Sequence, residues 1–205
     1  MDQFAFEYIT TAPQVSPDPD FEWLPFCQYM RVFTAAECKR IILQGRDAGM
    51  SPAVVIDSTT GLDDTDDESR VSDVGWLDYR NVAQYGWIME RLGGYARDAA
   101  TTLGIDIVGF EEHLQVARYG PGGHYAEHQD GPGRGGTHRR KLSVVVQLSK
   151  ASEYTGGHLQ VMEDVADRAI GSATFFASFL NHTAQPVTRG ERWSLVSWIG
   201  GPPFR

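Results

Sequence analysis

Residues 119–130 read YGPGGHYAEHQD, and the rest of the sequence is interpreted from this segment. The segment ends in His128-Gln129-Asp130, and side chains at positions i and i+2 of a β-strand share one face. The H-x-D tripeptide therefore directs an imidazole and a carboxylate to the same point. Together with a distant histidine, these groups can form a 2-His-1-carboxylate facial triad, which binds Fe(II) and leaves other positions open. Because H-x-D also occurs by chance, this interpretation depends on residues later in the chain.

The C-terminal part of the chain supplies a second histidine and a candidate anion-binding residue. His182 follows an apolar run at 173–179, and Arg192 opens an alternating strand, RWSLVSWI. Four residues of that strand share one face: Arg192, Ser194, Val196 and Trp198. An arginine that points inward between apolar neighbours needs an anion, because a buried unpaired charge is costly. A dicarboxylate held by the planar guanidinium fork would provide that anion.

The order of these motifs resembles iron(II)/2-oxoglutarate-dependent dioxygenases, most closely the prolyl 4-hydroxylase-like and PKHD-type bacterial hydroxylases. The resemblance covers residues 110–200 and is carried by Tyr119, His128-x-Asp130, Gly156-Gly157-x-Leu159, His182, the PVTRGER run that ends at Arg192, and a closing W-I-G. Weaker similarities occur at Arg70–Leu77 and Phe33–Ile42. The chain departs from the family at His158, where members often carry Glu. It also departs in the Arg- and His-rich loop after Asp130, which leaves the substrate open.

The resemblance implies a double-stranded β-helix, or jelly roll, that binds one Fe(II) through three catalytic residues, His128, Asp130 and His182. It also implies that Arg192 binds the distal carboxylate of 2-oxoglutarate and that Tyr119 hydrogen-bonds this co-substrate. Ser194 shares the face of Arg192 and is a further cofactor-binding candidate. For Tyr119 and Ser194, an ordinary role in the core is the alternative.

The reaction implied by the resemblance consumes O2 and 2-oxoglutarate, releases succinate and CO2, and hydroxylates an unactivated C–H bond. Asp130 favours hydroxylation, because related halogenases lack this carboxylate. Ascorbate is an additional candidate cofactor.

Length and composition indicate one domain. The chain has 205 residues, of which 41% are hydrophobic, and this is enough for a substantial core. We therefore expect a single domain over residues 1–205, with an extended N-terminal arm at 1–22 and a catalytic jelly-roll core at 105–200. The formal net charge of −9 argues against nucleic acid as the principal partner.

Cysteine usage and hydropathy suggest a cytoplasmic protein without a membrane partner. The two cysteines, Cys27 and Cys38, do not form a disulfide framework and are interpreted as reduced thiols. No apolar run is long enough for a membrane helix, and the N-terminus shows no signal peptide.

Two helices and many short strands are predicted. Thr34 and Glu37 fit a capping box for a helix over 35–48, and Asn81 resembles the cap of a second helix that ends at Gly104 and bends at Gly93-Gly94. Strands are expected at 23–30, 53–56, 71–77, 110–119, 124–128, 142–149, 158–162, 173–177, 183–187 and 192–199. This pattern predicts a mainly β (α+β) fold of two packed sheets. Together with the resemblance, this pattern predicts a jelly roll in which both helices pack against one sheet.

Two charged segments, the acidic Asp57–Ser69 and the basic RGGTHRR run at 134–140, have two interpretations. Either both are solvated loops, or both lie at the open end of the barrel and close over the substrate. Tyr125, Arg134 and Arg139 are the candidate substrate-contacting residues, because they lie close in sequence to the H-x-D motif.

Three functions remain open at this point. The first is a hydroxylase of an amino-acid unit, prolyl or other, peptidyl or free. The second is an oxygenase of another small metabolite or of an alkylated base. The third is a non-catalytic metal-binding jelly roll, which would have no need for Arg192 at its spacing from His182. The expected partners are O2 and an amino-acid, peptide or small-molecule substrate.

Overall fold

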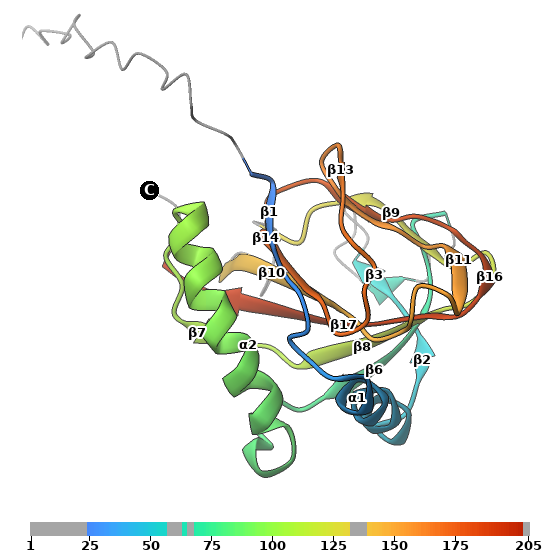
Figure 1. Ribbon diagram of the computed structural model, residues 1–205, viewed down its shortest axis with the longest axis horizontal. Helices are drawn as coiled ribbons and strands as arrows, with labels where there is room; N and C mark the ends of the chain where they lie inside the picture. Colours follow the sequence, from blue (N-terminus) through green and yellow to red (C-terminus); the bar gives the residue numbers. More distant parts are fainter. Residues whose placement is uncertain (1–23, 57–62, 65–67, 132–138, 203–205) are drawn as a thin grey trace, which may run out of the picture.

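The computed structural model describes residues 24–56, 63–64, 68–131 and 139–202. These residues form two helices and two main antiparallel sheets, and both helices lie against the larger sheet (Figure 1). The arm expected at 1–22, most of the acidic loop at 57–69, and Arg134 lie outside the described residues. Within the described part of the chain, no helix is long and apolar enough to cross a membrane.

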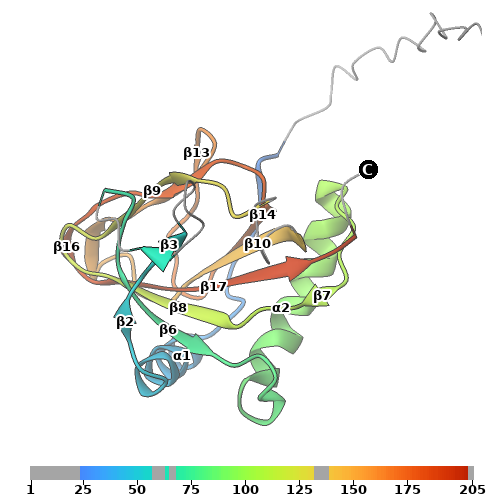
Figure 2. The same ribbon diagram turned by 180° about the vertical axis from the view of Figure 1, so that it is seen from behind.

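The larger sheet has eight strands in the order β1-β14-β10-β17-β8-β6-β2, and β7 pairs with β17 beside this path. Their bounds are β1 Phe26–Tyr29, β2 Ser51–Pro52, β6 Asp73–Leu77, β7 Gly109–Phe110, β8 Leu114–Tyr119, β10 Arg140–Gln147, β14 Ala173–Ala177 and β17 Arg192–Gly200. In the view from behind, β17, β8 and β6 lie side by side, with α1 beneath them and β9 above (Figure 2).

The smaller sheet has five strands in the order β13-β12-β15-β9-β5. Their bounds are β5 Arg70–Val71, β9 His124–His128, β12 Leu159–Val161, β13 Asp164–Val165 and β15 His182–Ala184. Two further two-stranded sheets pair β3 Val55–Ile56 with β4 Asp63–Asp64, and β11 Tyr154–Gly156 with β16 Val187–Gly190. Every strand pair in the described residues is antiparallel.

Both helices begin at the caps that the sequence predicts. Helix α1 spans Ala35–Asp47, where the Thr34 side chain accepts a hydrogen bond from the Glu37 N–H and the Glu37 carboxylate accepts one from the Thr34 N–H. Helix α2 spans Val82–Leu103, with Asn81 as its N-cap and Gly104 in the left-handed conformation as its C-cap. Its helical hydrogen bonding continues through Gly93 and Gly94, the position of the predicted bend.

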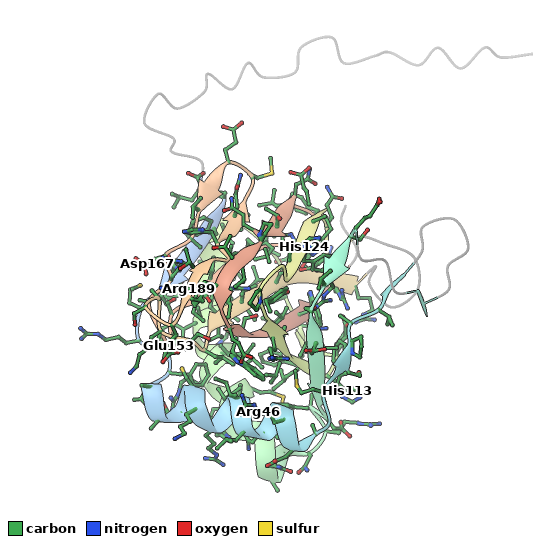
Figure 3. All side chains as sticks on the ribbon, turned by 90° about the vertical axis from the view of Figure 1, so that its right-hand side faces the viewer. Arg46, His113, His124, Glu153, Asp167 and Arg189 are labelled. Atoms are coloured by element: carbon green, nitrogen blue, oxygen red, sulfur yellow. The ribbon has the colours of Figure 1, made fainter. Side chains whose placement is uncertain are left out.

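The main core lies between the helices and one face of the larger sheet. Alternate residues of β10 and β17 enter this core, among them Val144, Val146, Trp193 and Leu195. The intervening residues face the smaller sheet, as the sequence predicts for Val196. Figure 3 shows the layers from the side: Arg46 marks α1 on one side of the larger sheet, and His124 marks β9 on the other. Arg192 and Ser194 of β17, which alternate with these core residues, therefore line the interior between the two sheets.

Three predicted strands are divided in the structure, and a fourth begins later than expected. The strand expected at 71–77 forms β5 and β6, which lie in different sheets, and the strand expected at 110–119 forms β7 and β8. Of the strand expected at 53–56 only β3 forms, because the buried Ala53 donates its N–H to the Ser72 carbonyl. The strand expected at 183–187 is divided into β15 and β16. Pro186 lies between them and has no N–H to donate to a strand ladder.

The glycine turn that faces Pro186 permits no side chain at its first position. Gly156 has φ +78°, and a Cβ built there would lie 2.2 Å from the Pro186 carbonyl oxygen. Both the left-handed backbone and the close approach therefore require glycine.

We expect Gly156→Ala to lower the free energy of unfolding by at least about 2 kcal/mol, because it combines left-handed strain with a backbone clash. The matched control is Gly94→Ala in α2, where a built Cβ meets nothing within 4 Å. This control should raise stability by about 0.5–1 kcal/mol. Urea unfolding of both variants is the measurement, and equal effects would contradict this account of the turn.

Candidate metal centre

Two segments that are distant in sequence, residues 128–130 and residue 182, bring three side chains together between the two sheets. His128 ends β9 and His182 begins β15, and these two residues are cross-strand partners. Asp130 follows just beyond β9. The His182 Nε2 lies 3.3 Å from Asp130 Oδ2, and the His128 Nε2 lies 3.7 Å from Asp130 Oδ1. The potential ligand atoms of all three residues lie within 4.8 Å of one another, close enough to contact one ion.

Backbone carbonyls orient both imidazoles. The His128 Nδ1 lies 2.8 Å from the Ala126 carbonyl oxygen, and the His182 Nδ1 lies 3.0 Å from the Leu180 carbonyl oxygen. Each Nδ1 is thereby the donating nitrogen, and each Nε2 lone pair is free to bind a metal. The arrangement is the one by which proteins commonly hold metal-binding histidines.

Asp130 is fixed from its backbone and from its side chain. Its N–H and that of Gly131 both donate to the Ser178 carbonyl oxygen, at 3.0 and 2.9 Å. The Ser143 hydroxyl donates to Asp130 Oδ2 at 2.7 Å and lies 2.9 Å from the Ser178 hydroxyl. Although Asp130 lies outside β9, the larger sheet holds its carboxylate in place.

The protonation states suit a cation. Burial, followed by repulsion from His182, lowers the pKa of His128 to about 4. Burial by itself would raise the pKa of Asp130, but His182, His128 and Ser143 together hold it well below its usual range. Burial also acts to lower the pKa of His182, and the Asp130 carboxylate outweighs it and raises that pKa. The centre therefore offers one ionised carboxylate and one neutral imidazole, and a metal ion can take the place of the His182 proton.

Arg192 lies deeper between the sheets as a buried cation without a partner. Its side chain is 2% exposed, and its Nε and Nη2 make no hydrogen bond. No carboxylate of the described residues lies within ion-pair distance of it. Gly157 leaves space beside it, because a Cβ there would lie 3.1 Å from Arg192 Cδ. The guanidinium is thus prepared for an anion that the described residues do not supply.

Other buried polar groups around Arg192 also lack partners. Ser194 Oγ, Tyr154 Oη and both polar atoms of the Gln147 side chain make no hydrogen bond. Gln147 and Ser194 are cross-strand partners, and Tyr154 approaches the same built Cβ of Gly157 as Arg192. Tyr119 pairs across strands with Arg192, whose Cζ lies 5.3 Å from the Tyr119 ring centroid.

Of this cluster, the sequence predicts Tyr119 and Ser194 but not Gln147 and Tyr154. The signal for Gln147 was present as a polar residue that follows three valines in the run LSVVVQL. Its register against Ser194, which gives it a place in this cluster, depends on long-range strand pairing.

The three candidate substrate residues have different outcomes. The Tyr125 ring stacks on the His128 ring with centroids 3.4 Å apart, so Tyr125 lies at the centre. Arg134 is outside the described residues. The Arg139 guanidinium instead forms two hydrogen bonds with Glu111, at 2.7 and 2.8 Å.

Of the two basic-loop arginines that the structure describes, Arg139 and Arg140, it is Arg140 that approaches the centre. Its Nη1 lies 3.4 Å from the Asp130 carbonyl oxygen, and its Cζ lies 3.8 Å from the Trp198 ring centroid. A register shift between Arg140 and Leu142 interrupts the alternation that would place Arg139 on the same face as Ser143. Sequence alternation alone could not show this bulge.

Comparisons with known proteins agree with this geometry. Residues 114–200 match the family model of the 2OG-Fe(II) oxygenase superfamily. A PKHD-type hydroxylase of Sphingopyxis alaskensis is 37% identical over 91 residues, which are 41% of this chain and 42% of that protein. One of Maricaulis maris is 38% identical over 90 residues, which are 42% of this chain and 41% of that protein. The chain thus matches less than half the length of these curated relatives.

Solved structures share the fold. A Pseudomonas putida prolyl-4-hydroxylase superposes with a TM-score of 0.66 at 20% identity, covering 87% of this chain and 93% of that one. A Trichoplax adhaerens prolyl hydroxylase, in complex with a peptide fragment of hypoxia inducible factor, gives a TM-score of 0.68 at 19% identity, covering 86% and 84%. The predicted jelly roll with two helices is confirmed, and so is the resemblance over residues 114–200.

Arg192 also generates a prediction about stability. In the metal-free protein, Arg192→Met should raise the free energy of unfolding by about 1–4 kcal/mol, because it replaces an unpaired buried charge with an apolar side chain of similar length. Urea unfolding in the presence of a chelator measures this. The control is Arg118→Met, whose guanidinium is paired with Asp73 and Glu191. A stability gain for Arg118→Met equal to that for Arg192→Met would contradict the assignment of Arg192 as unpaired.

Proposed function

We propose that this chain is an Fe(II)- and 2-oxoglutarate-dependent dioxygenase that hydroxylates an unactivated C–H bond of an amino-acid unit. The observation that carries this proposal is the unpaired Arg192 guanidinium, buried in the same interior as the three-residue metal centre. A metal-binding protein without catalysis would have no use for that cation. The family match over residues 114–200 and the names of the relatives support the same reaction class.

Each part of the interior has a function in this proposal. His128, Asp130 and His182 would hold Fe(II), and the two neutral donors with one carboxylate suit this ion. When bound, the iron and 2-oxoglutarate supply the oxidising chemistry, in which O2 is consumed and succinate and CO2 are released. Arg192 would bind the distal carboxylate of the co-substrate.

The neighbouring polar groups complete the co-substrate site. Gln147, Ser194 and Tyr154 provide hydrogen-bond donors beside Arg192, and their present lack of partners is what supports this role. Tyr119 would contribute its hydroxyl from the adjacent strand. Ser143 keeps the Asp130 carboxylate oriented and ionised, so that the metal does not have to reorganise it.

The amino-acid substrate class rests on the relatives. The structural neighbours named above are prolyl hydroxylases, and one of them holds a peptide. For this chain, we propose prolyl and other amino-acid residues equally as the hydroxylated substrate, with O2 as the second substrate. We place the activity in a single domain with its catalytic core at 105–200. Cys27 and Cys38, both free thiols, agree with the cytoplasmic location that the sequence suggests.

The metal assignment is tested with His182→Ala. This variant should lose tight Fe(II) binding, measured anaerobically by calorimetry, because it removes one of three donors. It should also lose the succinate formation that the intact protein shows with 2-oxoglutarate, assayed with and without ascorbate. His113→Ala is the control, since His113 lies beside Asp78 outside the centre. Stoichiometric iron and full turnover in His182→Ala would refute the assignment.

The co-substrate assignment is tested with Arg192→Met. Loss of the charge-assisted bonds should cost about 3–5 kcal/mol, which is roughly a hundred- to several-thousand-fold weaker 2-oxoglutarate binding. Calorimetry on the Mn(II)-loaded protein gives this number without turnover. Metal affinity in the absence of 2-oxoglutarate should persist, and Arg118→Met should bind 2-oxoglutarate normally. If Arg192→Met also binds it normally, the anion site lies elsewhere.

A further inference from the structure

We propose that Arg70 selects a substrate that carries a free carboxylate, so that the hydroxylated unit is a free amino acid or the C-terminal residue of a peptide and not an internal residue. This inference rests on the proposed function and adds the chemical class of the substrate to it. It depends on one buried cation beside the metal centre and on how the other charges there are balanced.

Arg70 is buried, and its hydrogen bonds to described side chains go to neutral groups. It lies in β5, opposite Tyr125 in β9, and is 8% exposed. Its Nε donates to Ser72 Oγ and its Nη2 donates to Gln115 Oε1, both at 2.8 Å. No carboxylate of the described residues forms an ion pair with it. These contacts fix the plane of the guanidinium without neutralising it.

Arg70 reaches the metal centre through the Tyr125 ring. Its Cζ lies 4.6 Å from the ring centroid, and the same ring stacks on the imidazole of His128. The Nη1 atom of Arg70 makes no hydrogen bond with a described residue, and it is not fully buried. Nη1 can therefore donate to a ligand without giving up a contact with a described residue.

The remaining charges of the centre are already balanced. Arg140, whose Nη1 lies 3.4 Å from the Asp130 carbonyl oxygen, pairs through two nitrogens with Glu112. Arg192 would be neutralised by the distal carboxylate of 2-oxoglutarate, and Asp130 by the metal. Among the cations at the centre, Arg70 is then the one that neither a described carboxylate nor the co-substrate neutralises.

A substrate carboxylate would neutralise the Arg70 guanidinium, whereas an internal peptide residue would not. Leaving a buried guanidinium without an anion is costly, and a carboxylate accepts charge-assisted hydrogen bonds from it. The carbonyl groups that flank an internal residue are neutral and leave the charge in place. A site built around such a cation should therefore bind a carboxylic acid and reject the corresponding amide.

The experiment compares acids with their amides. Calorimetry on the Mn(II)- and 2-oxoglutarate-loaded full chain uses the common L-amino acids, including proline, each as free acid and as primary amide. A second arm uses N-acetyl dipeptides with a C-terminal acid or amide, which distinguishes a peptide terminus from a free amino acid. A third arm uses tripeptides blocked at both ends. We expect at least one acid to bind at least tenfold tighter than its amide, and the blocked tripeptides not to bind.

Variants then test Arg70 itself. Arg70→Gln should weaken binding of the preferred acid about a hundredfold and leave binding of its amide unchanged, and Arg70→Lys should restore part of the preference. Arg80→Gln, an exposed arginine that pairs with Asp78, is the control and should bind as the unaltered protein does. An equal loss of acid, amide and 2-oxoglutarate binding in Arg70→Gln would indicate a purely structural role and overturn the proposal.

Other outcomes separate this proposal from the function on which it rests. If only the blocked tripeptides bind, or if no acid of the panel binds, while Fe(II) and 2-oxoglutarate still bind and yield succinate, the proposed function stands and the role of Arg70 is wrong. If the chain binds neither iron nor 2-oxoglutarate, the proposed function fails and the substrate class fails with it.

Discussion

Alternation along β17 and β10 is the constraint on which the rest of the molecule depends. One set of residues, including Trp193 and Leu195, seals the larger sheet against the helices. The other set turns Arg192, Ser194 and Gln147 into the space between the sheets. A shift of one residue in either strand would exchange the two sets, placing a guanidinium in the apolar core. The apolar packing of the helices therefore also determines which polar groups face the interior.

Burial gives these polar groups their chemical properties. In water, an arginine and two histidines would be satisfied by solvent and would show little preference for a particular ligand. Between the sheets, the Arg192 guanidinium has no hydrogen-bonded or ion-pair partner among the described residues, while the imidazole of His182 lies against an ionised carboxylate. The protein thus holds an unpaired buried cation at Arg192, and the free energy of that charge becomes available for binding. Hydrophobic packing elsewhere maintains this arrangement.

Local sequence signals predicted the elements well, and long-range pairing accounts for what they missed. The caps at Thr34 and Asn81 and the facing residues of β17 follow from spacing alone. Resemblance to a family brought His128, Asp130 and His182 together. Neither source could place Tyr154, whose strand pairs with β16, or could choose Arg140 over Arg139, because a bulge at the start of β10 decides it.

The anchoring of Asp130 has a consequence for how such a protein can diversify. Asp130 and Gly131 are bound to the Ser178 carbonyl oxygen at one end of the segment 131–140, and Arg140 is bound to Glu112 at the other. Both attachment points belong to the folded body, in which Ser143 also holds the Asp130 carboxylate. Sequence changes between these two anchors can therefore accumulate while the contacts that hold Asp130 persist. Selection can vary the segment beside the candidate metal centre independently of the residues that form that centre.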